Sequence, residues 1–484
     1  MSRFQPIVQT SDGPYVRFKI HSTNGTRITT GRPHQMLCAT VPADIDDTIA
    51  AVAKLGTTNL MLPTVSSWLG KADRSAAVIL TAYHRVASPV HLPTVYPVEL
   101  GVRAYQYEPR TFEPEARAKL EAFMSPLVHG AFAPVNNAAS ERRCVEGRIN
   151  SLRKPEPVQN TFRDHCMQEF ADLLIEDMIL IPVDYDTVAE SQTRPAQKIS
   201  LRRAVLSGPS LVRRLKCFLK AEAYSDIKDP RNISTYNDSD KLSMSGFALA
   251  LSEHCKKFPW YAPGKTPLQI AHRVAEICSG ADSFVNVSDY HRMDGTISYV
   301  LRRVDRMVAM KAFPHHSDEL NELLKRNVDN KGTLPFGTTF EQESTHGSGC
   351  PATSVFQTLR AGFTAYLAYR HTKSKTGKVY SPLEAFAAIG IHLGDDGLDA
   401  DLPVADHEWA ANAVGLILEA NIIPLGERGV TFLARYYSPD VWHGSLDSMC
   451  DIKRQLSKFH TTVRLPFGVT AEHKLVEKAM AYLA

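Results

Sequence analysis

Two acidic clusters that lie far apart in the sequence carry the clearest chemical signal. The first is Asp289–Asp294 (DYHRMD) and the second is Gly394–Gly397 (GDDG). Each follows an apolar run that predicts a strand, so each puts carboxylates at a strand end, where neighbouring strands can bring them together around hard cations. Phosphoryl transfer by two divalent ions requires this arrangement, because one ion lowers the pKa of the attacking hydroxyl and the other neutralises the leaving pyrophosphate.

Length and composition are those of an ordinary globular protein. The chain has 484 residues, of which 44% are hydrophobic, and a net charge of +3. Length alone suggests about three structural lobes. Because no overall basic field is present, a nucleic-acid partner must be held by local patches. Such patches exist, with eight Lys/Arg against three acids from Arg202 to Arg231, and six acids without Lys or Arg from Asp395 to Glu408.

The cysteine and hydropathy patterns add two expectations. Eight scattered cysteines form no CxxC pair and no metal-ligand spacing with histidine, which indicates reduced thiols in a cytosolic compartment. No apolar run approaches the roughly 18 to 20 residues that span a bilayer. The first residues, Met1–Gln5, lack the apolar region of a signal peptide. We therefore expect no intrinsic transmembrane anchor.

Local patterns predict the elements that position the two clusters. A strand over 283–288 leads into Asp289, and apolar residues at helical spacing over 297–308 predict a helix that packs onto it. A second strand over 386–393, a tight turn and a strand over 398–402 carry the other cluster, because Asp-Gly suits a hairpin turn. Three further elements are a helix over 164–179, a β-prone segment over 15–20 and a helical stretch over 48–55.

Each acidic cluster also has a simpler explanation. Asp395 and Asp396 could lie in a solvated hairpin turn. Asp294 could be favoured as a helix N-cap, since it precedes a helical pattern. The second explanation accounts for Asp294 but leaves Asp289 at a strand end without a purpose.

A third motif, His346–Thr353, is a small-residue loop that leads into a helix. Gly347 and Gly349 flank Ser348 and permit backbone conformations that other residues resist, so a nucleotide or template strand can approach closely. The alternative is a plain loop with a proline at the helix start.

A fourth motif is basic and extended. Lys216–Glu222 and Lys228–Ile233 make a row of cations that could hold a triphosphate, with Glu222 able to pair with one of them. A charge run is usually a solvated face, but the interleaved Phe218, Leu219 and Ile233 indicate that part of this segment is anchored in the fold.

The order of these motifs resembles that of viral RNA-dependent RNA polymerases, in which they are called motifs F, A, B and C. In addition, Val430–Tyr437 resembles motif E, the hairpin that grips the primer end. The resemblance covers roughly residues 200 to 440. The chain is most similar to nodavirus-type and related positive-strand RNA virus polymerases, in the segments Phe218–Tyr224, Asp229–Ile233, Met293–Ser298 and Gly394–Leu398.

The resemblance implies roles for individual residues. Asp289 and Asp395 would bind two Mg²⁺ ions, with Mn²⁺ as an alternative and Asp396 as a weaker or indirect ligand. Asp294 would reach the ribose 2′-hydroxyl of the incoming nucleotide with Ser348 and Thr353. Lys220 and Arg231 would bind the triphosphate, and Glu222 would brace these two side chains. RNA would be contacted by Gly347, Ser348, Gly349 and Arg435.

Two departures from the family pattern stand out. Gln357 occupies a nucleotide-binding position at which many relatives carry Asn, and this longer amide makes similar hydrogen bonds only if the pocket is deeper. Motif D often supplies a lysine as general acid, but no lysine occurs between Lys378 and Lys453. Arg428 or His407 could substitute, and a guanidinium would act mainly by its charge.

The implied fold is α+β, a right-hand polymerase with fingers, palm and thumb and an antiparallel RRM-like palm sheet covered by helices. The implied subdivisions are an N-terminal extension linking fingers and thumb (1–130), fingers (131–282, with a basic segment at 202–233 that admits nucleotides, and 314–346), palm (283–313 and 347–438) and thumb (439–484).

The implied activity is RNA synthesis from ribonucleoside triphosphates on an RNA template, during replication and transcription of a viral genome. The implied partners are template and nascent RNA, ribonucleoside triphosphates and other viral replication proteins. The implied location is the host cytoplasm, in membrane-associated complexes through other factors. Two alternatives stay open: a reverse transcriptase, and a catalytically silent RNA-binding replication subunit. The second should have lost a metal aspartate, and none is lost.

Overall fold

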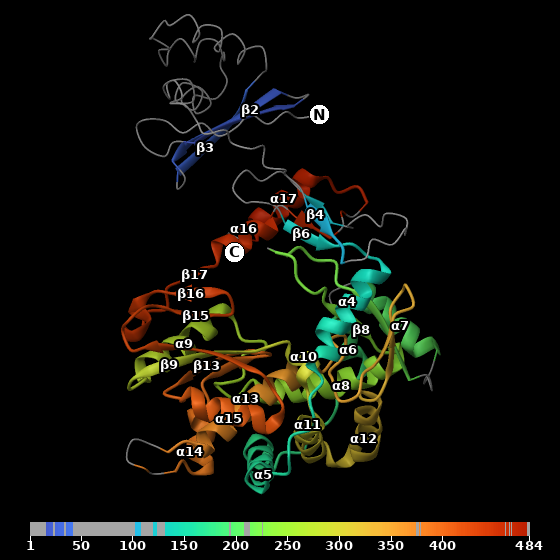
Figure 1. Ribbon diagram of the computed structural model, residues 1–484, viewed down its shortest axis with the longest axis vertical. Helices are drawn as coiled ribbons and strands as arrows, with labels where there is room; N and C mark the ends of the chain where they lie inside the picture. Colours follow the sequence, from blue (N-terminus) through green and yellow to red (C-terminus); the bar gives the residue numbers. More distant parts are fainter. Residues whose placement is uncertain are drawn as a thin grey trace, which may run out of the picture. The chain divides into compact units, whose positions relative to one another are not determined.

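The computed structural model divides the chain into two compact units, Met1–Glu99 and Leu100–Ala484 (Figure 1). The described residues are 16–22, 25–32, 35–41, 102–107, 120–122, 131–192, 195–207, 213–224, 226–373, 377, 379–459, 461–463, 465 and 467–481. The helical stretch predicted over 48–55 lies outside them.

The described part of the first unit is a three-stranded antiparallel sheet. Its strands are β1 (Val16–Ser22), β2 (Gly25–Arg32) and β3 (Gln35–Val41), in that order. The predicted β-prone segment over 15–20 overlaps β1, which pairs Ile20 with Arg27 of β2.

The second unit is built around a four-stranded antiparallel sheet in the order β12-β13-β9-β14. The strands are β12 (Ile391–Leu393), β13 (Asp396–Ala400), β9 (Phe284–Tyr290) and β14 (Leu418–Pro424). The register pairs Ser288 with Gly397 on one side of β9 and Asp289 with Glu419 on the other. Both acidic clusters therefore belong to one sheet.

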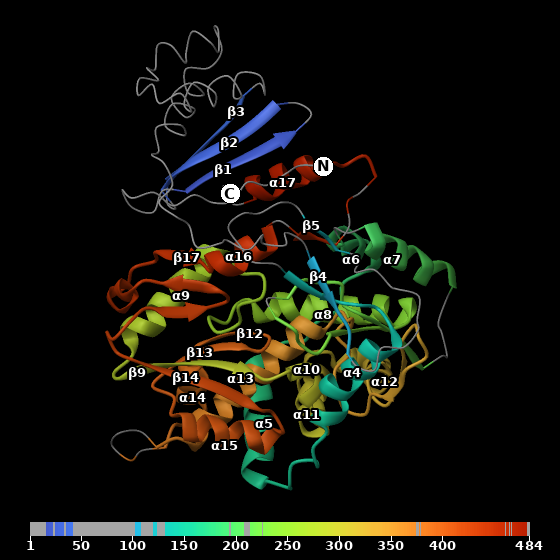
Figure 2. The same ribbon diagram turned by 45° about the horizontal axis from the view of Figure 1, so that its top comes forward.

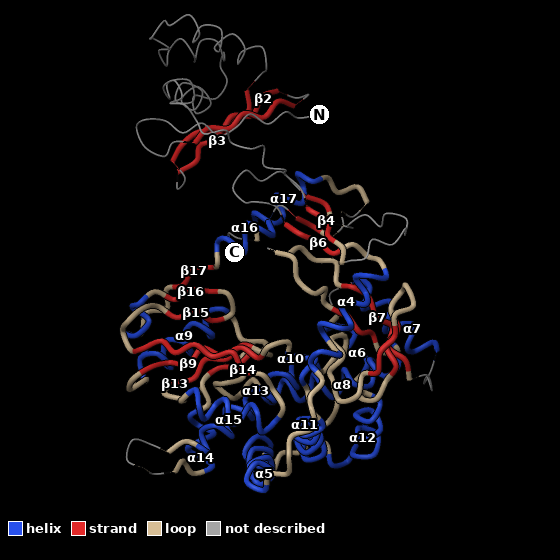
Figure 3. The backbone as a smooth tube through the Cα atoms, viewed as in Figure 1, coloured by secondary structure: helices blue, strands red, loops and turns tan. Residues whose placement is uncertain are grey.

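Helices cover both faces of this sheet (Figures 1 and 3). On one face, Val285 and Leu398 pack in an apolar cluster with α9 (Pro267–Gly280). The opposite face lies on α13 (Thr353–His371) and α15 (Val404–Val414). Because side chains alternate along a strand, Asp289 and Asp396 share the α9 face with Val285 and Leu398.

A second sheet carries the basic motif. It has the order β11-β10-β7-β8, with β10 parallel to β7 and the other pairs antiparallel. Its strands are β7 (Arg214–Leu219), β8 (Asn232–Thr235), β10 (Lys331–Thr333) and β11 (Thr339–Glu341). Exposure alternates along β7, which turns Leu215, Cys217 and Leu219 into the main apolar core and the basic side chains outward.

Smaller sheets complete the described strands. Their members are β15 (Val430–Phe432), β16 (Arg435–Tyr437) and β17 (Ser448–Cys450), then β18 (Thr461–Thr462) with β5 (Glu121–Ala122), and β4 (Val102–Tyr105) with β6 (Ala131–Pro134).

The remaining helices are α4 (Ala138–Arg148), α5 (Thr161–Ile175), α6 (Tyr185–Ser191), α7 (Pro195–Ser207), α8 (Asp238–Cys255), α10 (Met293–Thr296), α11 (Tyr299–Ala312), α12 (Ser317–Arg326), α14 (Pro382–Ala388), α16 (Ile452–Phe459) and α17 (Ala471–Met480), with 3₁₀ turns at Asn150–Leu152, Pro314–His316 and Pro439–His443.

Two predicted elements are partly wrong. The strand predicted over 386–393 begins only at Ile391, because residues 386–388 end helix α14. Ser381 and Glu384 form a reciprocal capping box and Pro382 occupies the first turn, and both features start a helix at this point. The predicted helix over 164–179 forms as α5 but ends earlier, at Ile175.

The described residues include no helix that is long and apolar enough to cross a membrane. The cysteines whose side chains are described, seven in number, are all free thiols.

Candidate active site

The two acidic clusters belong to β9 and to the β12–β13 hairpin, and β9 and β13 are neighbours in one sheet (Figure 2). Asp289 is the penultimate residue of β9, and Asp395 lies in the turn between β12 and β13. The amide of Tyr290 donates to the carbonyl oxygen of Asp395 at 3.2 Å. Gly394 makes the turn with φ +65°, a backbone conformation that favours glycine. Its amide donates to Oγ1 of Thr358 in α13 at 3.0 Å, so the turn is tied to the helix below.

The carboxylates of this cluster destabilise one another's charge. Burial, followed by the charges of Asp395 and Glu419, raises the pKa of Asp289 to about 6. Burial, followed by the charges of Asp395 and Asp289, raises the pKa of Asp396 to about 6. A bound cation would offset this repulsion and favour the ionised carboxylates.

The donor set fits hard divalent cations. Asp289, Asp395 and Asp396 offer carboxylate oxygens from neighbouring strands, and these are the ligands that Mg²⁺ prefers in proteins. Within the described part of the chain, no three or more His, Cys, Asp or Glu side chains are already grouped closely enough to hold a metal ion.

Two cavities meet at this cluster. The larger has a volume of about 1530 Å³ and is lined by Asp289 and Asp395 together with Asp294, Ser348 and Arg231. The second, of about 710 Å³, is lined by Asp289 and Asp396 and by residues of β15 to β17. Asp289 therefore borders both cavities, whereas Asp395 and Asp396 face different ones.

Asp294 lies in α10, on the wall of the larger cavity. Its Oδ1 accepts a hydrogen bond from Nε2 of Gln357 at 2.6 Å. Burial raises the pKa of Asp294, and the hydrogen bond from Gln357 and the charge of Arg360 oppose this rise. The long amide of Gln357 thus reaches the carboxylate of Asp294.

The His346–Thr353 loop lies against strand β8. Oγ of Ser348 donates to the carbonyl oxygen of Asn232 at 3.2 Å and accepts from the amide of Ser234 at 3.3 Å. Oγ1 of Thr353 donates to the carbonyl oxygen of Cys350 at 2.7 Å. Both hydroxyls line the larger cavity and also hold the loop in place.

The glycines of this loop are needed for a different reason from the one predicted. Neither Gly347 nor Gly349 has a positive φ. Instead, a Cβ on Gly347 would lie 2.5 Å from the hydroxyl of Tyr236, and a Cβ on Gly349 would lie 2.2 Å from the carbonyl oxygen of Ser234. The glycines therefore allow the loop to approach β8 closely.

Replacing Gly349 by alanine should destabilise the protein by about 1–3 kcal/mol, because the added methyl group meets backbone that cannot move aside. The loop would have to leave β8, so nucleotide incorporation should fall as well. Gly280→Ala is the matched control, since a Cβ there meets nothing within 4 Å. Urea unfolding of both variants checks the prediction, and equal stabilities would contradict it.

Part of the basic motif lines the larger cavity. Nζ of Lys220 lies 3.0 Å from Oε2 of Glu222, and Nε of Arg231 lies 3.9 Å from Oε1 of the same carboxylate. The amide of Lys220 donates to the carbonyl oxygen of Arg231 at 2.8 Å. Glu222 and Arg231 line the cavity. Glu222 therefore lies between the side chains of Lys220 and Arg231.

The larger cavity is also lined by three arginines to which the sequence analysis gave no role. Nε of Arg143 and Nη2 of Arg292 bind the two carboxylate oxygens of Asp229 at 2.6 and 2.8 Å, and Nη2 of Arg148 donates to its carbonyl oxygen at 3.0 Å. One carboxylate for three guanidinium groups leaves this part of the cavity wall positive. The available signal was the clustering of Arg142, Arg143 and Arg148 in the sequence, but their convergence on Asp229 needs the fold.

Three residues considered for RNA contact or for motif D lie away from the larger cavity. Nε of Arg435 donates to Oγ of Ser448 in β17 at 3.0 Å. Arg428 is exposed in the turn after β14. His407 is enclosed, 2.8 Å from the hydroxyl of Tyr290, and burial lowers its pKa to about 4. None of the three lines either cavity.

Comparison with known proteins yields similar sequences. No family model matches the chain. RNA-directed RNA polymerases are 31% identical in Pariacoto virus and 29% in Pieris rapae virus, over 73% and 71% of this chain. The corresponding polymerase of Greasy grouper nervous necrosis virus is 27% identical over 91% of the chain. These matches cover 36%, 34% and 45% of the relatives, so the chain spans less than half of their length.

Comparison with solved structures yields a similar fold. The RNA-dependent RNA polymerase of a human picorbirnavirus aligns with a TM-score of 0.56 over 71% of this chain and 70% of its own, at 11% identity. Its insertion-loop deletion mutant aligns equally well, with a TM-score of 0.56. The predicted resemblance is therefore confirmed: the chain is similar in sequence to nodavirus-type RNA-directed RNA polymerases, and its fold is that of viral RNA-dependent RNA polymerases.

Proposed function

We propose that this chain is an RNA-directed RNA polymerase that transfers nucleotidyl groups from ribonucleoside triphosphates to the 3′-hydroxyl of RNA. One observation supports this proposal most strongly. Asp289 and Asp395, which lie on β9 and in the turn before its partner β13, line one cavity together with Arg231 and other arginines. Carboxylates suit divalent cations, and guanidinium groups suit a triphosphate.

In this proposal the chain is arranged as a right hand. The sheet β12-β13-β9-β14, with helices on both faces, is an RRM-like palm built from 283–313 and 347–438. The fingers are 131–282 and 314–346, the thumb is 439–484, and residues 1–130 link fingers and thumb. Nucleotides would reach the site past the basic segment 202–233.

The proposed chemistry assigns each residue one task. Asp289 and Asp395, with Asp396 adjacent, would hold two Mg²⁺ or Mn²⁺ ions, which supply activation of the 3′-hydroxyl and neutralisation of the pyrophosphate. Lys220 and Arg231 would hold the triphosphate, and Glu222 would brace both side chains through its ion pairs with them.

Sugar recognition and the remaining contacts complete the assignment. Asp294 accepts a hydrogen bond from the 2′-hydroxyl, with Gln357, Ser348 and Thr353 around it. Gly347, Ser348 and Gly349 form the loop over which RNA passes, and Arg435 contacts RNA near the primer end. Arg428 contributes charge only.

The proposed partners are template RNA, nascent RNA, ribonucleoside triphosphates and other viral replication proteins. The proposed location is the host cytoplasm, in membrane-associated replication complexes that form through other factors.

An extension assay with labelled UTP on an RNA template, with and without a primer, tests the proposal. Template-dependent incorporation of ribonucleotides in the presence of Mg²⁺ or Mn²⁺ is the expected result. Efficient use of deoxyribonucleotides instead would favour a reverse transcriptase. RNA binding without any incorporation would favour a silent replication subunit.

A further inference from the structure

We propose that Arg360 is a positioning residue for sugar selection: it fixes the amide of Gln357 in the one orientation that lets Asp294 accept a hydrogen bond from the 2′-hydroxyl of a nucleotide. The inference rests on the proposed function, since it concerns the nucleotide that the larger cavity takes.

The first step concerns the direction of the hydrogen bonds. Nη1 of Arg360 donates to Oε1 of Gln357 at 2.8 Å, and Nε2 of Gln357 donates to Oδ1 of Asp294 at 2.6 Å. A guanidinium group can only donate. The amide oxygen of Gln357 must therefore face Arg360, and its NH₂ group must face Asp294. If the amide of Gln357 were flipped, its NH₂ group would face the guanidinium of Arg360, which is also a donor. Its oxygen would then face the carboxylate of Asp294, which is also an acceptor.

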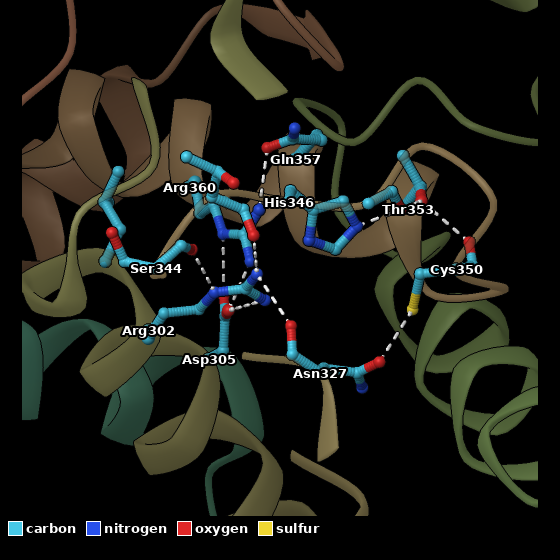
Figure 4. A network of polar contacts seen from close by, with 12 residues as sticks. Arg302, Asp305, Asn327, Ser344, His346, Cys350, Thr353, Gln357 and Arg360 are labelled. Atoms are coloured by element: carbon cyan, nitrogen blue, oxygen red, sulfur yellow. Dashed lines mark hydrogen bonds and ion pairs between the residues drawn. The ribbon is translucent and has the colours of Figure 1, made fainter. Parts of the chain in front are cut away.

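The second step concerns how Arg360 is held. Arg360 is fully buried, and its guanidinium binds both carboxylate oxygens of Asp305, with Nε to Oδ1 at 2.9 Å (Figure 4). Asp305 is itself 2% exposed. Such a bidentate pair fixes the plane of the guanidinium, so the third nitrogen, Nη1, has a defined direction toward Gln357.

The third step links the same carboxylate to the backbone of Asp294. Nη1 of Arg302 lies 3.8 Å from Oδ2 of Asp305. Arg302 also donates to the carbonyl oxygen of Ser344 at 2.9 Å (Figure 4). It donates to the carbonyl oxygen of Thr345 at 2.7 Å as well. The next residue, His346, donates its amide to the carbonyl oxygen of Asp294 at 2.8 Å.

Asp294 is thus held from two sides. The side-chain path runs through Gln357 and Arg360, and the backbone path runs through the segment that Arg302 binds. Both paths begin at Asp305. The charge of Arg360 also opposes the rise in the pKa of Asp294, which helps to keep the carboxylate an acceptor.

A purely structural role for Arg360 would predict equal losses for all nucleotides. Arg370 provides a matched control for a purely structural role, because it lies on the same helix, α13. Arg370 binds both carboxylate oxygens of Glu169 at 3.0 Å, and it has no contact with Gln357 or Asp294 among the described hydrogen bonds.

The test compares R360M and R370M in the extension assay with UTP, 2′-deoxy-UTP and 2′-fluoro-2′-deoxy-UTP. In R360M, Asp305 keeps Arg302 as a partner, so the protein should still fold. We expect its preference for UTP over 2′-deoxy-UTP, measured as the ratio of kcat/KM values, to fall by about 10- to 100-fold, the effect of losing a charge-assisted hydrogen bond. R370M should keep the wild-type ratio.

The fluorinated nucleotide tests the direction of the bond, because fluorine cannot donate. Wild-type protein should discriminate against it as it does against 2′-deoxy-UTP, and R360M should accept all three more equally. R360K keeps the charge without the planar fork, so its preference for UTP should lie between those of wild-type protein and R360M. An unchanged ratio in R360M, or an equal fall in R370M, would overturn the inference while the polymerase proposal stands. Wild-type protein that incorporates no UTP would defeat the polymerase proposal itself, and with it the inference.

Discussion

Replacing Asp395 by asparagine should abolish RNA synthesis and leave the fold intact. Asparagine keeps the size of the side chain and removes the charge that a divalent cation needs. Removing one ligand of a two-metal site costs several kcal/mol of transition-state stabilisation, so incorporation of UTP should fall by at least about 10³-fold.

The same substitution should slightly stabilise the metal-free protein. The charge of Asp395 contributes to the raised pKa of both Asp289 and Asp396. Removing it relieves repulsion, and the free energy of unfolding should rise by about 0.5–1 kcal/mol. Loss of activity together with unchanged or higher stability excludes unfolding as the cause.

Thermal unfolding with and without Mg²⁺ provides the measurement. Mg²⁺ should raise the Tm of the wild-type protein by mass action, and this increase should be smaller in D395N. Asp318→Asn is a suitable control, because Asp318 is exposed at the start of α12 and lies outside both cavities. Retained synthesis in D395N would refute the assigned role of Asp395.

The positions of the acidic residues could be predicted from sequence because each cluster follows a short strand. Asp289 and Asp395 come together through a single backbone register, and a register follows from the pairing of adjacent strands. The hairpin around Gly394 is likewise a local feature, since Asp-Gly and a positive φ belong to the same turn. Local signals therefore mark the strand end at Asp289 and the turn at Asp395, whereas the pairing of β9 with β13, which lie far apart in the sequence, needs the fold.

Contacts between distant segments could not be predicted in the same way. The requirement for Gly349 arises from the carbonyl oxygen of Ser234, and the positive wall arises from arginines that converge on Asp229. Neither partner is marked by composition or spacing. Phe386 shows a related difficulty, because its apolar neighbours suit a strand or a buried helix and only the cap at Ser381 decides between them.

The buried cluster around Asp305 is a further example, and it leads to the second large effect. Asp305→Ala should lower the free energy of unfolding by about 3–5 kcal/mol, because it leaves Arg360 buried without its ion pair. The charged form of Arg302 would also be destabilised, since burial and the charge of Arg360 already lower the pKa of Arg302. Two guanidinium groups would then repel each other with no carboxylate between them.

Removing Asp305 should cost more stability than removing Arg360. Urea denaturation of D305A and R360M measures this difference in the free energy of unfolding. R360M removes one cation and leaves Asp305 paired with Arg302, so its loss of stability should be smaller than that of D305A by at least about 1 kcal/mol. Asp172→Ala serves as a control, because Asp172 is exposed, its partner Lys311 is only half-buried, and such surface pairs contribute at most about 1 kcal/mol. If D305A were no less stable than D172A, water would have to reach the guanidinium of Arg360. The orientation of the hydrogen bonds from Arg360 to Gln357 and from Gln357 to Asp294 would then have no physical basis.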